Sequence, residues 1–177
     1  MKATGIIRRV DELGRIVIPK EIRRTLRIRE ADPLEIFTDK DGEIILKKYS
    51  PIGELSTTAQ EMAEALSHVT GELVCICDQD QVVAASGPES KKYMNKAITP
   101  DVESQIQNRE PIYGNGTKCR VTEDDNHVSI ALAPIICSGD AIGAVAILGK
   151  KEKNIMGDHE LKLATVAAEY LGKNLED

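Results

Sequence analysis

Positively charged side chains are concentrated at the beginning of this 177-residue sequence. Residues 1–29 contain nine lysines and arginines but only three acidic residues, so their net charge is +6. The whole chain carries a net charge of −6, and the remaining residues therefore carry −12. A basic segment ahead of an acidic body can attract a polyanion at one end only. The chemistry that these residue types predict for the segment is the binding of phosphate groups.

Thiol groups are the second set of side chains that could do chemistry. Cys75, Cys77, Cys119 and Cys137 include no C-x-x-C pair, which argues against a zinc ribbon or a thioredoxin-like motif. We expect reduced thiols in a cytoplasmic protein. Cys75 and Cys77 are two residues apart on a predicted strand, so their side chains point to one face. We interpret them as a small, buried and unreactive pair, and the alternative is a redox-active pair.

Histidines and acidic residues indicate no metal site. His68, His127 and His159 lack the H-E-x-x-H motif and any other ligand spacing. The acidic residues 123–125 are interpreted as a solvated turn. We therefore assign no catalytic residue, metal ligand or cofactor. No apolar run approaches the ~20 residues of a membrane span, and the first residues lack the apolar region of a secretion signal.

The first fifty residues must position the basic side chains, and they predict two pairs of short strands around a helical turn. Gly14 suits a positive-φ position in the first turn, and Asp41 with Gly42 ends the second. Pro19 ends a strand and fits the first turn of a helix. The expected elements are strands Ile6–Val10 and Arg15–Ile18, a helix over Lys20–Leu26, and strands Leu34–Thr38 and Glu43–Lys48.

These strands carry more apolar surface than one copy of the chain can cover. Residues 16–18 and 44–46 are apolar on both faces, whereas a unit of fifty residues covers only one face. We therefore expect two copies to interleave their hairpins, which buries both faces. The two-fold axis then places the paired arginines of both copies on one strongly positive surface.

The sequence MKATGIIRRVDELGRIVIPKEIRRTLRI resembles the swapped-hairpin DNA-binding domain of the AbrB transition-state regulators, through the ordered motif L-G-R-[IV]-V-I-P-x-E-[IL]-R-R-x-L. The resemblance implies that arginines on the first strand, after the first turn and in the helix contact double-stranded DNA. These are Arg8, Arg15, Arg23 and Arg24. Arg27 stands where relatives commonly have glycine at the helix end, and it adds a cation. With their basic neighbours, the candidate DNA-binding residues are Arg8, Arg9, Arg15, Lys20, Arg23, Arg24 and Arg27.

Two other interpretations of the basic segment remain open. Arginine runs on short helices are often solvated faces without a partner. An antitoxin of the same fold also binds DNA, but it carries a short acidic tail that wraps a toxin. Here a body of well over a hundred residues follows instead.

The body of the chain predicts a sheet between two helices. Residues 52–69 and 161–175 repeat apolar residues in steps of three and four, the spacing of helices that pack on helices. Asp158 is the expected N-cap of the second helix. Between the helices we expect strands over 72–77, 81–85, 128–136 and 141–148, a helical stretch over 89–109 and irregular residues 110–127. This layout resembles a GAF domain, a small-molecule sensing module.

The expected architecture is α+β, with a swapped-hairpin dimerising domain over residues 1–52 and a GAF-like domain over 53–177. This order resembles the stage V sporulation protein T family of endospore-forming bacteria over the full length. The resemblance implies a cytoplasmic, nucleoid-associated transcriptional regulator of sporulation genes, both activator and repressor, whose DNA binding the GAF-like domain modulates. We expect a homo-oligomer: a dimer through the N-terminal domain and a tetramer through the GAF-like helices.

Any small-molecule ligand of the GAF-like domain should occupy a pocket on the sheet face beneath residues 89–127. The aromatic residues of this domain are three tyrosines, Tyr93, Tyr113 and Tyr170. Cyclic nucleotides and bilins pack against aromatic rings, so both are disfavoured, and the ligand is not identified. The alternative from another functional class is a cysteine-dependent GAF-fold methionine sulfoxide reductase, or a redox sensor, tethered to DNA.

Overall fold

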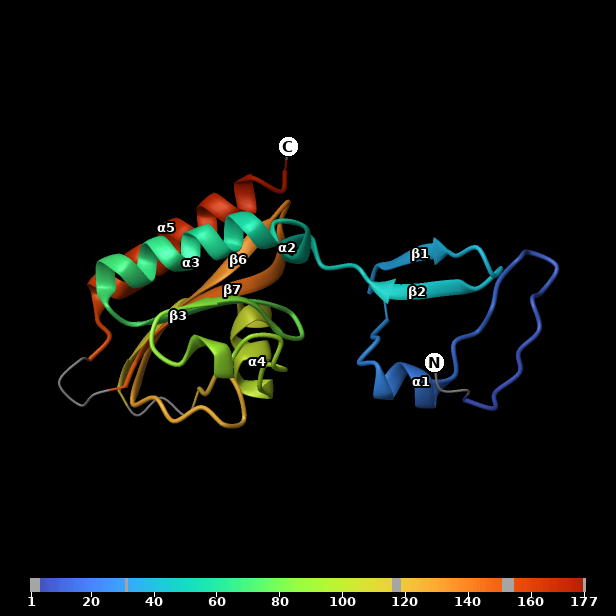
Figure 1. Cartoon of the computed structure of the whole chain (residues 1–177), viewed down its shortest axis with the longest axis horizontal. Coiled ribbons are helices and arrows are strands. Elements are labelled where there is room, and N and C mark those ends of the chain that lie inside the picture. The colour runs from blue at the N-terminus through green and yellow to red at the C-terminus, as the bar shows by residue number, and fades with distance from the viewer. Residues whose placement is uncertain (1–3, 31, 116–118, 151–154, 177) are drawn as a thin grey trace. The chain divides into compact units, whose positions relative to one another are not determined.

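The computed structural model describes residues 4–30, 32–115, 119–150 and 155–176 (Figure 1). The chain forms two compact units, Met1–Tyr49 and Ser50–Asp177. Both units combine helices with antiparallel sheets, which confirms the predicted α+β class.

The N-terminal unit contains one short helix and one hairpin. Its elements are α1 (Lys20–Thr25), β1 (Leu34–Thr38) and β2 (Ile44–Lys48). Pro19 precedes α1, where its fixed φ suits a helix start. The β1–β2 turn is held by Asp39, whose Oδ1 accepts hydrogen bonds from the amides of Asp41 and Glu43 at 3.0 and 2.9 Å. Gly42 completes the turn with φ +80°, which glycine adopts without a steric penalty.

The strands predicted over residues 6–10 and 15–18 are not formed within the described part of the chain. The turn between them does form, because the Asp11 amide donates to the Arg15 carbonyl at 3.0 Å. The most exposed apolar side chains of these segments are Ile7 (89%) and Val17 (72%). A strand needs a neighbour for its backbone groups, and this unit supplies none here. The prediction is therefore wrong for a single chain, and pairing with a second copy stays a prediction.

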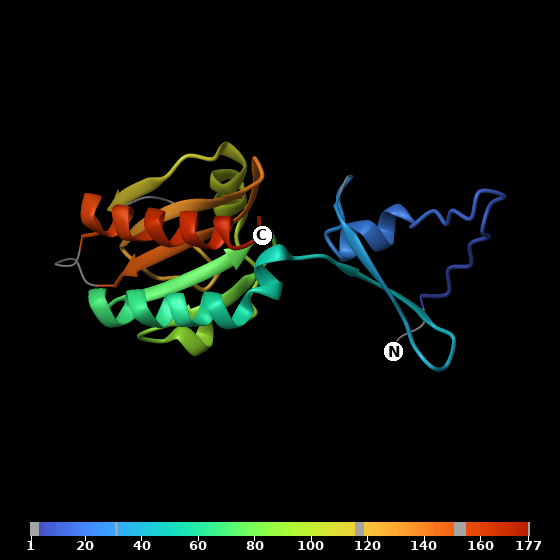
Figure 2. The ribbon, with the colours of Figure 1, turned by 90° about the horizontal axis from the view of Figure 1, so that it is seen from above.

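The C-terminal unit is a five-stranded antiparallel sheet with helices on both faces (Figures 1 and 2). Its strands are β3 (Leu73–Asp78), β4 (Val82–Ser86), β5 (Ile112–Asn115), β6 (Ser129–Cys137) and β7 (Asp140–Gly149). Its helices are α2 (Pro51–Glu54), α3 (Ser56–Thr70), the 3-10 helix η1 (Ser90–Lys92), α4 (Pro100–Asn108) and α5 (Asp158–Lys173). The strand order is β4-β3-β7-β6-β5.

Strand β3 contributes side chains to both halves of the core, because successive side chains of a strand point to opposite faces. Val74 and Ile76 pack on the face that α3 and α5 cover. Cys75 and Cys77 pack on the opposite face, together with Ile106 of α4. All six residues of β3 are buried, so both faces of the sheet are covered by the unit's own helices and loops.

The helix predicted over residues 52–69 is broken at Leu55 into α2 and α3. The Ser50 side chain caps α2, since its Oγ accepts from the Gly53 amide at 3.1 Å. The same hydroxyl donates to Asp78 Oδ2 at 2.8 Å, at the end of β3. The Ser50 hydroxyl thus connects the start of α2 to the end of β3, and α3 follows as a separate helix.

The apolar residues that repeat along α3 and α5 pack mainly on the sheet of their own chain. Leu66 and Leu171 are 7% and 0% exposed. The predicted N-cap Asp158 is wrong: the cap is Gly157, whose amide donates to Glu160 Oε2 at 2.8 Å. An acidic residue three positions after the cap can bind the cap amide. The start of α5 is therefore stabilised by the carboxylate of Glu160 and not by that of Asp158.

Helix α5 approaches the backbone of the sheet closely at Gly172. A Cβ atom built there would lie 2.1 Å from the carbonyl oxygen of Ile136 on β6. Atoms of side chains do not approach backbone oxygens so closely, and therefore only glycine lets the helix lie at this depth.

The outer edge of β4 is occupied by a side chain of α3. Gln60 Oε1 accepts from the Ala85 amide, and Gln60 Nε2 donates to the Ala85 carbonyl, both at 3.3 Å. The carboxamide thus makes the two hydrogen bonds that a residue of a further strand makes in an antiparallel ladder.

Residues 89–127 contain shorter helices and more strand than predicted. Among the described residues of this stretch, 90–92 and 100–108 are helical, and β5 lies within the part expected to be irregular. α4 begins where Thr99 Oγ1 accepts from the Val102 amide at 3.4 Å and Pro100 takes the first helical position. β5 was missed because four residues are too few to show a period.

Candidate nucleic-acid interface

The seven predicted DNA-binding side chains are all exposed on the N-terminal unit. In chain order they are Arg8 and Arg9 on the extended segment before the first turn, Arg15 after that turn, Lys20, Arg23 and Arg24 on α1, and Arg27 directly after α1. α1 has only six residues. Long recognition helices read base edges in the major groove, whereas exposed cations on short elements suit contacts with phosphates.

Arg15 is oriented by the turn that precedes it. Its Nε donates to Asp11 Oδ2 at 2.8 Å. The hydrogen bonds from the amide and the side chain of Arg15 lower the pKa of the Asp11 carboxyl below its ordinary value. The carboxylate uses one of the five N–H donors of the guanidinium, so four remain for a phosphate.

The end of α1 has a left-handed backbone geometry. The Arg27 amide donates to the Arg24 carbonyl at 3.3 Å, and the Ile28 amide donates to the Arg23 carbonyl at 2.8 Å. Together these bonds form a Schellman motif, whose left-handed position favours glycine. Arg27 occupies that position with φ +52°. The cap geometry is therefore kept, and the arginine adds a cation beside Arg23 and Arg24.

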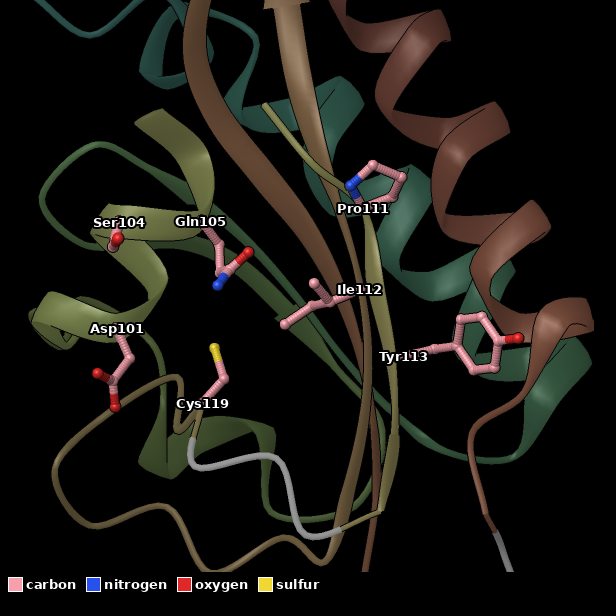
Figure 3. A pocket seen from close by; sticks show the side chains of 7 residues that line it. All are labelled: Asp101, Ser104, Gln105, Pro111, Ile112, Tyr113 and Cys119. Carbon is pink, nitrogen blue, oxygen red and sulfur yellow. The ribbon is translucent and has the colours of Figure 1, made fainter. Parts of the chain in front are cut away.

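A pocket of about 610 Å³ lies in the C-terminal unit between α4 and β5 (Figure 3). Its lining residues are Asp101, Ser104, Gln105, Pro111, Ile112, Tyr113 and Cys119. The side chains of Gln105, Ile112 and Cys119 point toward one space, whereas the Tyr113 ring points away from it. The pocket thus offers a carboxylate, an amide, a hydroxyl and a thiol, without an inward-pointing ring.

Sequence reasoning missed the polar residues of this pocket. Asp101, Ser104 and Gln105 are spaced i, i+3, i+4, which places them on one face of a helix. The pair Thr99-Pro100 gives the start of that helix from the sequence alone. Reading this start signal first would have found the polar face.

The cysteine chemistry agrees with the buried interpretation. Cys75 and Cys77 are completely buried. Burial raises the pKa of the Cys75 thiol well above its ordinary value and that of Cys77 to about 12. Cys119 lines the pocket, and burial followed by the nearby carboxylates of Asp101 and Asp125 raises its pKa to about 11. These thiols are protonated at neutral pH, and the thiol is a poor nucleophile.

The prediction of a solvated acidic turn is wrong for Asp125, which is 3% exposed. Its Oδ2 accepts from the Val121 amide at 2.8 Å, and its Oδ1 accepts from the Tyr93 hydroxyl at 3.1 Å and the His127 amide at 2.9 Å. The ring Nδ1 of His127 also lies against Oδ1. The carboxylate therefore holds the loop before β6 together, and His127 belongs to this structural network.

Within the described ranges, no group of three or more histidine, cysteine or acidic side chains could hold a metal ion. None of the helices that the structure describes has the length and apolar character needed to cross a bilayer.

Two family models match the chain. Residues 54–176 match the stage V sporulation protein T C-terminal, transcription factor model. Residues 7–54 match the model of the antidote-toxin recognition MazE, a bacterial antitoxin.

Two similar proteins cover nearly all of the chain and part of the chain, respectively. Stage V sporulation protein T of Bacillus subtilis strain 168 is 50% identical and covers 99% of both chains. The transition state regulatory protein AbrB of the same organism is 43% identical over 61% of this chain and 96% of its own.

Solved structures resemble the C-terminal unit in fold. The PixJ GAF domain of Thermosynechococcus elongatus in its blue-light absorbing form has a TM-score of 0.58 and 13% identity, covering 73% of this chain and 89% of that chain. A type II free methionine-R-sulfoxide reductase from Thermoplasma acidophilum has a TM-score of 0.57 and 11% identity, covering 70% of this chain and 94% of that chain. The shared fold confirms the predicted GAF-like architecture.

Proposed function

This chain belongs to the stage V sporulation protein T family, and from that premise we propose how it acts. It is a DNA-binding transcriptional regulator of sporulation genes and works in the cytoplasm. The seven basic residues of the N-terminal unit hold double-stranded DNA, and the GAF-like unit adjusts that binding. The observation that carries this assignment is the exposure of all seven cations on a unit whose net charge is opposite to that of the rest of the chain.

The proposed mode of binding is contact with phosphates and with DNA shape, with modest sequence preference. The arginines lie on an extended segment, after a turn, and on or directly after a six-residue helix, and these short elements reach few base edges at a time. Each phosphate that is neutralised releases counterions, so the logarithm of affinity falls with the logarithm of salt concentration with a slope of about −0.9 per phosphate.

Salt titration of the full-length protein tests the assignment. Arg23→Ala removes one cation from each copy, so a dimer that uses both should lose about two units of slope. Lys173→Ala is the matched control, because Lys173 is an exposed cation of the C-terminal unit. Unchanged affinity and slope after substitution of Arg8, Arg15, Arg23 and Arg24 would overturn the DNA-binding role of these residues.

The DNA-binding form is a dimer in which the hairpins of two copies interleave. Exposed apolar side chains of the N-terminal unit support this arrangement. They include Ile7, Val17, Ile36 and Ile44. Covering a side chain of this size stabilises by about 1.5–3 kcal/mol when burial is complete, and the second copy provides both this cover and the missing strand neighbours.

The GAF-like units pair in turn through the outer faces of α3 and α5, which makes the full protein a tetramer. Val69, Val166 and Tyr170 are 73%, 68% and 47% exposed on these helices. Val166→Asp should therefore reduce the tetramer to a dimer in sedimentation experiments. Leu66 and Leu171 are buried within the chain, so substituting them tests folding rather than assembly.

The proposed ligand of the pocket is a small polar molecule that exploits Asp101, Ser104 and Gln105. Thermal shift screening of the full chain against such compounds tests this proposal, with Gln105→Leu as the variant that loses the shift.

The competing function, a methionine sulfoxide reductase, requires a reactive thiol. Assaying reductase activity before and after replacing all four cysteines distinguishes the two functions.

A further inference from the structure

The end of α1 is held by a lysine that lies 21 residues further along the chain. Lys48 is the last residue of β2, and its Nζ donates to the Arg27 carbonyl at 3.2 Å. The amide of Arg27 already belongs to the Schellman motif of α1. The peptide groups on both sides of this left-handed residue are thus fixed, one by the helix and one by the strand.

An acidic side chain completes this contact. Lys48 Nζ lies 3.0 Å from Asp32 Oδ2, and the two side chains are 20% and 10% exposed. The same carboxylate oxygen accepts from the Arg29 amide at 2.7 Å. Burial raises the pKa of Asp32, but the Arg29 amide and the Lys48 ammonium outweigh this effect and lower the pKa below its ordinary value. Asp32 is therefore ionised at neutral pH.

This contact joins the arginine-bearing helix to the strand by which the chain leaves the N-terminal unit. Lys48 pairs with Leu34 in the hairpin register, and the next residue, Tyr49, donates its amide to the Pro33 carbonyl at 3.0 Å. The contact between Lys48, Asp32 and Arg27, which we call the cap clamp, therefore fixes the end of α1 relative to the end of β2.

We propose that Lys48 is a positioning residue for DNA binding: through the cap clamp it sets the direction in which α1 presents Arg23, Arg24 and Arg27. This inference rests on the proposed role of those arginines as DNA contacts. Lys48 belongs to none of the seven candidate positions, and its ammonium contacts a carbonyl and a carboxylate of its own chain.

The decisive comparison is between two neighbouring lysines of β2 in the full-length protein. Lys48→Met keeps the length of the side chain and removes the cap clamp. Lys47→Met removes the same charge, but Lys47 lies over the Phe37 ring, with Nζ 4.8 Å from the ring centroid. Affinity for a preferred duplex, affinity for an unrelated duplex and the salt slope are measured for each, and stoichiometric titration at low salt counts the competent molecules.

We expect Lys48→Met to weaken binding to the preferred duplex by roughly twofold to thirtyfold, the range of substitutions that act through a connecting network. The salt slope should stay unchanged, because no phosphate contact is lost, and the ratio between preferred and unrelated duplex should fall. Counting competent molecules separates this effect from simple unfolding. Lys48→Arg, which retains donors for both acceptors, should restore most of the affinity.

Other outcomes overturn the proposal. Equal behaviour of Lys48→Met and Lys47→Met would show that only charge matters, and a slope reduced by about two units would make Lys48 a phosphate ligand. If Lys48→Met does not fold, Asp32→Asn decides, because the amide oxygen can still accept from Arg29 while the ion pair is lost. Unchanged binding in Asp32→Asn then refutes the cap clamp. Failure of the wild type to bind DNA at all would instead refute the proposed function.

Discussion

Backbone geometry and charge make opposite demands on residue 27. The left-handed conformation of Arg27 favours glycine, since a Cβ atom at positive φ costs energy. The guanidinium is nevertheless exposed next to two other arginines of α1. An exposed charge kept at a position that favours glycine is consistent with the DNA contact that we propose for Arg27.

Two substitutions at this position separate the two demands. Arg27→Gly should raise the free energy of unfolding by about 1 kcal/mol, because it relieves the left-handed strain. Arg27→Ala removes the same charge and keeps the Cβ atom, so it should not stabilise. Both should flatten the salt slope of DNA binding equally. Chemical denaturation and salt titration measure the two effects, and stabilisation by Ala equal to that by Gly would contradict the strain argument.

Replacing the buried Asp125 should strongly lower the free energy of unfolding of the C-terminal unit. Asp125→Ala leaves the Val121 and His127 amides without their acceptor, which should cost about 2–4 kcal/mol. The neighbouring Asp124→Ala removes an exposed carboxylate and should change stability by less than about 0.5 kcal/mol. Urea unfolding of the full chain compares the two.

The stabilising effect of Asp125 should also depend on pH. Burial raises its pKa, but the hydrogen bonds from His127 and from the Val121 amide outweigh burial, and the net pKa is lowered. A carboxyl with a lowered folded pKa stabilises fully above its unfolded pKa of about 3.9, and the effect is lost as pH falls through the folded value. The stability difference between wild type and Asp125→Ala should therefore be constant near neutrality and shrink below about pH 4.

Single residues could be predicted from the sequence where their type and neighbours carry the signal. The basic candidates stood out because one sign of charge is clustered in 29 residues. Asp125 could not be separated from Glu123 and Asp124, because three adjacent acids look alike until the loop folds around one of them. Lys48 and Asp32 likewise meet only in three dimensions.

At the scale of elements, predictability followed the length and regularity of the apolar pattern. β6 and β7 were predicted to within a residue or two, because a tight turn at Gly139 separates two long apolar runs. The segments 6–10 and 15–18 have strand sequences but lack a neighbour in one chain. β-propensity describes fit to a neighbouring strand more than a preference of the backbone. We therefore expect these segments to form strands only when a second copy supplies the neighbouring strand.

The packing of α5 on β6 gives a sharp test at the same scale. Gly172→Ala places a methyl group where the Ile136 carbonyl already lies, so α5 must shift outward. We expect a loss of about 1–3 kcal/mol, as for other overpacked cores. Glu169→Ala is the control, because Glu169 is an exposed residue of the same helix and its replacement does not alter the contact with the sheet. Equal denaturation midpoints for both variants would contradict this account of the helix–sheet contact.

On the scale of the whole molecule, the two units differ in how much of their apolar surface they cover themselves. The C-terminal unit buries both faces of its sheet with its own helices and loops. The N-terminal unit leaves large apolar side chains uncovered. Family membership confirms the resemblance found in the sequence, whereas the number of copies in the assembly depends on surfaces that one chain leaves open.

This difference predicts two unfolding transitions with different concentration dependence. The urea midpoint of the N-terminal transition should rise with protein concentration. For a dimer, each tenfold increase in concentration raises the free energy of unfolding by about 1.4 kcal/mol. In Val166→Asp, the C-terminal transition should no longer depend on concentration. Far-UV circular dichroism in urea at concentrations a hundredfold apart measures both. An N-terminal midpoint that stays constant over that range would contradict interleaving of two copies.

The carboxamide of Gln60 has a consequence for how this protein avoids polymerising. An uncovered outer strand is a template on which other chains can add, and such addition leads toward fibrils. By filling both backbone positions of Ala85, Gln60 closes part of the template on β4 without adding a strand. The chain thereby loses one route to open-ended growth, and the association that we propose through its helices and hairpins can stop at a defined number of copies.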